Sequence, residues 1–321
     1  MTAPAPPGAH SHRPHSRRSR GRRSHGRTWA GPLMALPAVT GLVLFAALPF
    51  AMAVGLSLFN VRLDSFRPPD FMALEQYRRI LVSPEFSGDF YRALGNNVLF
   101  AAVIVPVQTA AALALALLLN RPLRAMPVFR TFFFMPVVFP MALIATVWRL
   151  FLDPGPDGVL NAVLGAVTFG LFSPHDWLGE ASTAMPSIML LSLWQGVGFQ
   201  MVILLAGLQG IPGQLYEAAQ VDGAGRWQRF RAVTLPGLRN TLVFVALVTT
   251  ILSFRLFDQV YILTRGGPDG ATSTVMHLAV TTAFAESNVS RAAAMTVVLF
   301  VVVLGLTLLQ RRLVTQEREI S

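Results

Sequence analysis

Two charged residues, Arg255 and Asp258, stand inside an otherwise apolar stretch at residues 240–263. A charge within a membrane-length apolar segment is costly, so it marks a functional site by default. Residues three apart share one face of a helix, so the first interpretation is a mutual or inter-subunit ion pair. A polar lining that contacts substrate and a simple placement near the membrane surface are the alternatives.

Composition excludes several other kinds of chemistry. All 26 basic residues are Arg, so the chain has neither a P-loop lysine nor a Schiff-base lysine. It has no Cys, which excludes disulfides, Cys-ligated zinc and thiol nucleophiles. Asp153 and Asp157 flank a Pro-Gly-Pro turn and are not a paired-carboxylate site. We therefore predict no catalytic residue, no metal site and no cofactor bound by this chain, and we disfavour a membrane enzyme.

Hydropathy indicates a membrane protein. Of the 321 residues, 53% are hydrophobic and 13% are charged, and the mean hydropathy is +0.54. A soluble domain carries about 25% charged residues. A spanning helix needs ~20 apolar residues, and six segments approach or exceed this length: 32–61, 93–120, 131–148, 181–216, 240–263 and 292–310.

The distribution of Arg predicts the orientation. With six spans, one side of the membrane receives 17 Arg and four acids, whereas the other receives eight Arg and eleven acids. The positive-inside rule then places both termini in the cytoplasm. The Arg- and His-rich residues 1–29 are predicted to be a disordered cytoplasmic tail rather than a nucleic-acid-binding arm. The first apolar run exceeds a secretory signal, so we expect an uncleaved helix.

The most informative segment is the loop at residues 211–236, on the predicted cytoplasmic side. Pro212 suits the first turn of a helix, and Asp222-Gly223 is typical of a turn. A second short helix is expected from residue 226 to residue 233. Ala218 and Ala219 carry little bulk, so another surface could approach closely. A plain interfacial helix joining two spans is the alternative.

The spacing in this loop resembles the signature of inner-membrane permease subunits of binding-protein-dependent ABC importers. That signature is Glu-Ala-Ala, three residues, Gly, nine residues, Ile, one residue, Leu-Pro. The chain matches every interval, with Val233 in place of Ile as the only change. The resemblance implies that the loop docks on an ATPase subunit through Glu217, Ala218, Ala219, Asp222, Gly223, Ala224, Leu235 and Pro236.

A second match narrows the resemblance to carbohydrate-type permeases of the maltose and glycerol-phosphate kind. It covers residues 261–268, ending in Gly-Gly-Pro, and Ser273-Thr274. One departure is Ser290-Arg291, where the family usually has Gly and an aromatic residue. The resemblance implies an all-α membrane protein with the type I importer fold and six transmembrane helices, over a permease domain at residues 30–315. A short cytoplasmic tail, residues 316–321, would follow.

The resemblance also implies partners. We expect a non-enzymatic half-pore in the bacterial inner membrane that assembles with a second permease subunit and two ATPase subunits. The ATPase subunits would bind ATP and magnesium, and a solute-binding protein outside the membrane would deliver a sugar. Membrane lipid would surround the chain, and no nucleic acid is expected.

Polar residues in the fourth apolar segment are candidates for the substrate path. Ser192, Gln195 and Gly196 match positions at which maltose-type relatives contact sugar, counted back from Glu-Ala-Ala. Only Gly196 and its neighbour Trp194 keep the family residue type. Arg255 and Asp258 complete the predicted path, and polar residues that merely bridge helices are the alternative. Alternative functions are an ABC permease for a non-sugar solute and an ion-coupled secondary transporter.

Overall fold

The computed structural model describes residues 30–66, 68–121 and 126–316. The predicted tail at residues 1–29 therefore lies outside the described residues, as does the predicted C-terminal tail apart from its first residue. The chain divides after Pro49 into two compact units.

The first spanning helix begins in the first unit and ends in the second. It comprises α1 (Ala30–Leu42), a π-helical turn (Val43–Ala47) and α2 (Leu48–Ser57). Its 24 apolar residues Met34–Ser57 are long enough to cross a bilayer, whose hydrocarbon core is ~30 Å thick. The helix ends four residues before the end of the apolar segment at residue 61.

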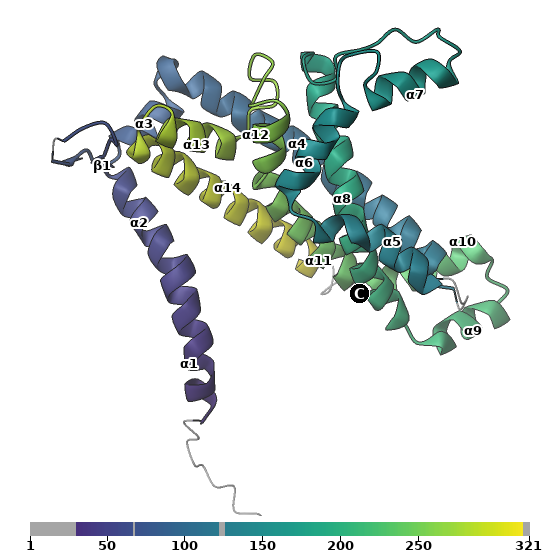
Figure 1. The fold of residues 1–321 in the computed structure, drawn as a ribbon. Coiled ribbons are helices and arrows are strands. Elements are labelled where there is room, and N and C mark those ends of the chain that lie inside the picture. The colour runs from purple at the N-terminus through teal and green to yellow at the C-terminus, as the bar shows by residue number, and fades with distance from the viewer. Residues whose placement is uncertain (1–29, 67, 122–125, 317–321) are drawn as a thin grey trace, which may run out of the picture. The chain divides into compact units, whose positions relative to one another are not determined.

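The second unit is organised around four long apolar helices. Helix α4 packs against both α8 and α11, and α14 packs against α11 (Figure 1). Three clusters of buried apolar side chains fill the spaces between them. The four helices are α4 (Pro84–Leu119), α8 (Ala181–Gln209), α11 (Leu235–Phe254) and α14 (Val289–Gln316).

The third predicted span is two helices rather than one. Helices α5 (Met126–Val138) and α6 (Met141–Phe151) meet at an angle of 97°. Pro140 stands at the break, lacks an N–H and disfavours helical backbone at the preceding residue. Within the described residues there are five candidate spans, or six when this bent pair counts as one. The prediction of six apolar spans agrees with this architecture.

Shorter elements join the long helices. Strands β1 and β2 form an antiparallel pair in which Phe59 lies opposite Phe71. Helices α9 and α10 lie at the end of α8 where residue 209 stands, and α7 lies near its other end (Figure 1). These elements are β1 (Phe59–Asn60), β2 (Asp70–Phe71), α3 (Glu75–Leu81), α7 (Val159–Val167), α9 (Gly213–Val221), α10 (Arg226–Arg229), α12 (Asp258–Leu263) and α13 (Val275–Phe284).

Ser290 and Arg291 fasten the start of α14 to its surroundings. The backbone N–H of Val61 donates to Ser290 Oγ at 2.6 Å. Arg291 pairs with Glu286 at 3.2 Å, and its guanidinium lies 3.7 Å from the ring centroid of Phe86. The two residues that depart from the family pattern therefore tie the last span to the segments before α3 and at the start of α4.

Glycine permits the close crossing of α5 and α8. A Cβ atom at Gly198 would collide with the backbone carbonyl of Phe133, which belongs to α5. Backbone atoms cannot move aside as a side chain can, so the crossing requires the absence of a side chain at residue 198. Small residues at helix crossings are the usual means of close packing in membranes.

We expect Gly198→Ala to lower the melting temperature of the chain purified in detergent, because overpacking a crossing costs about 1–3 kcal/mol. Gly95→Ala is the matched control, since a Cβ atom at that helical glycine meets nothing within 4 Å. The control should keep or raise the melting temperature, because Ala favours helix over Gly. Equal melting temperatures for the two variants would contradict the crossing assignment.

Candidate functional site

The loop at residues 211–236 forms the predicted helix–turn–helix. Pro212 precedes the first residue of α9, and Gly225 precedes α10. The side chain of Gln228 accepts the N–H of Gly225 at 2.7 Å, which satisfies one of the free donors at the start of α10. A π-helical turn (Phe230–Thr234) then leads directly into α11. The second helix thus continues into the following span.

Gly223 closes the first helix of the loop. Its φ is +77°, a conformation that glycine adopts without steric cost. The N–H of Gly223 donates to Gln220 O at 3.1 Å, and the N–H of Ala224 donates to Ala219 O at 2.9 Å. This pair of bonds is a Schellman motif, which ends a helix by satisfying its last carbonyls. The turn therefore favours glycine at this position.

The loop presents an accessible surface. Glu217, Ala218, Asp222 and Gly223 are exposed, and Ala219 and Ala224 are half-buried. Within the described residues, Glu217 has no ion pair, so its carboxylate is available to a basic partner group. Leu235 and Pro236 are exposed and form the first residues of α11.

Tyr216 links the loop to the base of the following span. Its hydroxyl shares a hydrogen bond of 3.0 Å with the hydroxyl of Thr234, which is buried. Trp227, which the sequence analysis did not single out, is 70% exposed and stacks on Phe230 with centroids 5.3 Å apart. The feature of the sequence that could have indicated Trp227 is a large aromatic residue among polar residues in a short helix. Trp227 adds an apolar contact surface to the loop.

The fifth span is broken where Arg255 and Asp258 occur. Helix α11 ends at Phe254, Arg255 caps it, and Asp258 begins α12. The prediction that both residues lie on one helical face is therefore wrong, because Phe257 departs from helical backbone with φ −140° and ψ −59°. No ion pair joins Arg255 and Asp258 in the part of the chain that the structure describes.

Asn97 of α4 and Thr274 satisfy the backbone at this break. Asn97 Nδ2 donates to Ser253 O at 3.4 Å and to Phe254 O at 3.5 Å, and its Oδ1 accepts the N–H of Val275 at 3.0 Å. The hydroxyl of Thr274 donates to Leu256 O at 2.7 Å. Irregular backbone at membrane depth requires partners of this kind, because lipid offers none.

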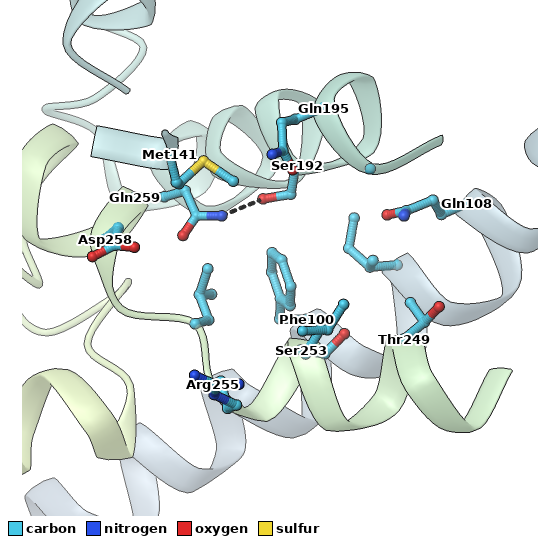
Figure 2. Close-up of a pocket in the computed structure, with 14 residues that line it drawn as sticks. Phe100, Gln108, Met141, Ser192, Gln195, Thr249, Ser253, Arg255, Asp258 and Gln259 are labelled. Carbon is cyan, nitrogen blue, oxygen red and sulfur yellow. Dashed lines mark hydrogen bonds between the residues drawn. The ribbon is translucent and has the colours of Figure 1, made fainter. Parts of the chain in front are cut away.

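A cavity of about 280 Å³ lies beside the break, between α4, α8 and α11 (Figure 2). Its volume is close to the lower limit of small-molecule sites, ~300 Å³. Apolar side chains and a ring of amides and hydroxyls form its wall. The lining residues are Phe100, Ile104, Gln108, Met141, Ser192, Gln195, Gly196, Thr249, Leu252, Ser253, Arg255, Leu256, Asp258 and Gln259.

Five of the six predicted path residues line this cavity. Helix α8 supplies Ser192, Gln195 and Gly196, and the break in the fifth span supplies Arg255 and Asp258. Figure 2 places the two charged side chains on different sides of the cavity. Trp194 is not among the lining residues. It lies instead with its ring centroid 5.8 Å from that of Trp148.

The structure adds polar lining residues that sequence reasoning missed. They are Gln108 of α4, Thr249 and Ser253 of α11, and Gln259 of α12. Gln259 Nε2 donates to Ser192 Oγ at 3.3 Å, which joins α12 to α8 (Figure 2). In the sequence each of these is an uncharged polar residue near or within an apolar run. Such a residue does not by itself show whether its side chain faces the cavity, another helix or lipid.

Two lining residues have a polar side-chain group without a hydrogen-bond partner. Within the described residues, Gln195 makes no hydrogen bond, and the buried hydroxyl oxygen of Ser253 has no partner. The absence of a side chain at Gly196 leaves room for the amide of Gln108 in the cavity wall, because a Cβ atom there would collide with that amide. Amides and hydroxyls both donate and accept hydrogen bonds, so this wall suits a ligand rich in hydroxyls.

Among the described residues, no group of three or more His, Asp or Glu side chains could hold a metal ion. The polar groups of the cavity wall are amides, hydroxyls and the charged side chains of Arg255 and Asp258.

Comparison with known proteins identifies the family. The model of the binding-protein-dependent transport system inner membrane component matches residues 108–318. The chain belongs to this family. The permease is thus a component of a binding-protein-dependent transport system and differs in class from ion-coupled secondary transporters.

Individual relatives agree with this assignment. The chain is 36% identical to the trehalose/maltose transport system permease protein of Thermococcus litoralis, over 78% of this chain and 81% of the relative. It is 32% identical to the diacetylchitobiose uptake system permease protein of Streptomyces coelicolor, over 82% of this chain and 75% of the relative.

A solved structure shares the fold. It is a bacterial alginate ABC transporter in complex with an alginate pentasaccharide-bound periplasmic protein, and it matches with a TM-score of 0.73 and 23% identity. The match covers 88% of this chain and 93% of that chain. The permease therefore has the helical fold of type I ABC importers, as predicted.

We expect Asn97→Leu to lower the melting temperature of the purified permease. The variant leaves the N–H of Val275 without its partner and removes the side-chain bonds to the carbonyls of Ser253 and Phe254, and one buried unsatisfied group costs roughly 1–3 kcal/mol. Val98→Ala is the control, because Val98 is the next residue on α4 and is exposed. If Asn97→Leu unfolds at the same temperature as the control, Asn97 does not support the break.

Proposed function

We propose that this chain is the membrane subunit of an ABC importer that carries a sugar or a related polyol across the bacterial inner membrane. The observation that carries the proposal is the exposed loop in which Glu217, Ala218, Ala219 and Gly223 keep the permease spacing around a Schellman turn. The permeases for trehalose/maltose and for diacetylchitobiose, to which the chain is similar, support the sugar class.

The proposed assembly contains five chains: this permease, a second permease subunit, two ATPase subunits and a solute-binding protein. ATP hydrolysis takes place on the ATPase subunits, since this chain has no lysine with which to build a P-loop. The alginate transporter was solved with a periplasmic protein bound, which supports a binding protein as partner. Both termini lie in the cytoplasm by the positive-inside rule.

In the proposed mechanism, the loop carries closure of the ATPase subunits to the cavity. Glu217 faces a basic group of the ATPase, and the small residues Ala218 and Gly223 allow close approach. The π-helical turn joins the loop to α11, whose other end lines the cavity. Movement of the loop is thus transmitted along one continuous helical segment to the substrate path.

In the cavity, side-chain amides and hydroxyls replace the water around the hydroxyls of the sugar. Gln195 and Gln108 supply donors and acceptors, and Phe100 supplies an apolar ring face. A second candidate is an ABC permease for a charged solute. The cavity favours it in one respect, because Arg255 and Asp258 both line it without forming an ion pair.

Gly223→Trp should uncouple transport from ATP hydrolysis. The importer is reconstituted in vesicles with its partner chains, and uptake of a radiolabelled sugar is measured beside release of phosphate. Gly223→Ala is the control, because it carries the same strain of positive φ with little added bulk. We expect uptake to fall at least about tenfold below this control, equivalent to ~1.4 kcal/mol of docking energy. Normal ATP-driven uptake by Gly223→Trp would overturn the coupling role.

Gln195→Ala should impair uptake more than assembly. The amide makes no hydrogen bond within the described residues, so its removal leaves no group of the permease unpaired. One hydrogen bond to a substrate hydroxyl contributes about 0.5–1.5 kcal/mol, so the concentration for half-maximal uptake should rise up to about tenfold. Leu190→Ala, an exposed change on the same helix, is the control. Wild-type uptake kinetics for Gln195→Ala would remove this residue from the path.

A further inference from the structure

Helix α7, in the connection between α6 and α8, presents an apolar face outward. Its exposed residues recur at intervals of three and four, which places them on one side of the helix. The turn after the helix adds Phe169, which is 96% exposed, and Leu171, which is 88% exposed. The exposed residues of the helix are Val159, Ala162, Val163, Ala166 and Val167.

The polar side chain of α7 points to the interior instead. Asn161 is buried, and its Nδ2, which has two hydrogens to donate, lies 3.1–3.3 Å from the carbonyl oxygens of Asp153, Pro154, Gly155 and His175. Its carbonyl accepts the indole N–H of Trp177 at 2.8 Å. Asn161 therefore holds both ends of the connection together, and the helix is turned so that its apolar side faces out. A helix on a water-exposed surface has the opposite arrangement.

Charge is absent along this apolar segment. Residues 158–172 contain no Asp, Glu, Lys or Arg, whereas the exposed residues Asp153, Asp157 and Asp176 stand on either side of it. The helix has nine residues, about 14 Å, so it is too short to cross a bilayer. These properties describe a segment that lies along a membrane surface rather than through it.

The position of α7 agrees with such a surface. The helix starts eight residues after α6 ends, and α8 starts 14 residues after α7 ends. Both neighbours belong to membrane-crossing segments. Helix α7 packs against α6, whose last residues Leu150 and Phe151 are themselves exposed and apolar. Figure 1 shows α7 beside the end of α8 that is remote from α9 and α10.

We propose that α7 and the turn at Phe169–Leu171 rest in the lipid leaflet opposite the loop at residues 211–236, at the boundary between headgroups and acyl chains. The apolar face continues the exposed surface of α6, and its occupant is lipid. A binding protein that docks and leaves would meet a more polar surface, because transient interfaces are about as polar as ordinary protein surface. The exposed α7 residues are all Val or Ala.

The proposal is tested with single nitroxide spin labels. The chain has no Cys, so Val163→Cys and the control Asp157→Cys each provide one labelling site. The labelled importer, with partner chains free of reactive thiols, is placed in phosphatidylcholine nanodiscs. Accessibility of the label to oxygen, which concentrates in lipid, is compared with accessibility to a water-soluble nickel complex. We expect the ratio of oxygen to nickel accessibility to be several-fold higher at residue 163 than at residue 157.

Two results would overturn the proposal. One is an equal ratio at both labels, which places α7 in water. The other is a label at residue 163 that loses nickel accessibility only when the solute-binding protein is added, which makes the face a protein docking surface. Val167→Cys, on the same face, repeats the measurement if the first variant fails to assemble. Because the labels report depth and not uptake, the result is independent of the sugar specificity proposed above.

Discussion

The break in the fifth span is the feature on which the rest of the site depends. A chain inside a membrane must satisfy its own backbone groups, so a helix can stop at that depth only where side chains replace the lost bonds. Asn97 and Thr274 do this between α11 and α12. The interruption turns Arg255 and Asp258 out of a common helical face and toward one cavity. The hydrogen bonds that stabilise the break therefore also help to determine which side chains line the cavity.

The same span connects the loop at residues 211–236 to the cavity. Its first residues, Leu235 and Pro236, belong to the loop motif, and its last turns carry Thr249 and Ser253 to the cavity wall. The hydrogen bond between Tyr216 and Thr234 fixes the loop to the base of this helix. One helix that runs from the loop to the cavity is a direct physical means of transmitting the movement proposed above.

Local features were predictable from sequence, and features that depend on packing were not. The turn at Gly223 follows from residues within six positions of each other, so spacing alone predicted the helix–turn–helix. The cavity combines residues from five helices, and the sequence does not show which way an uncharged polar side chain such as that of Gln108 or Ser253 points. Trp194 illustrates the reverse case, because it keeps the family residue type yet packs against Trp148.

The sequence by itself determined that the chain is a membrane permease, because apolar length, Arg distribution and motif spacing are properties read along one chain. Only the tertiary structure decided which polar residues share a cavity and that Asn161 turns the apolar face of α7 outward. Both outcomes depend on hydrogen bonds between residues distant along the chain or on different elements. The energies of these hydrogen bonds depend on the distance between the groups and on their burial, and both quantities are known only from the folded structure.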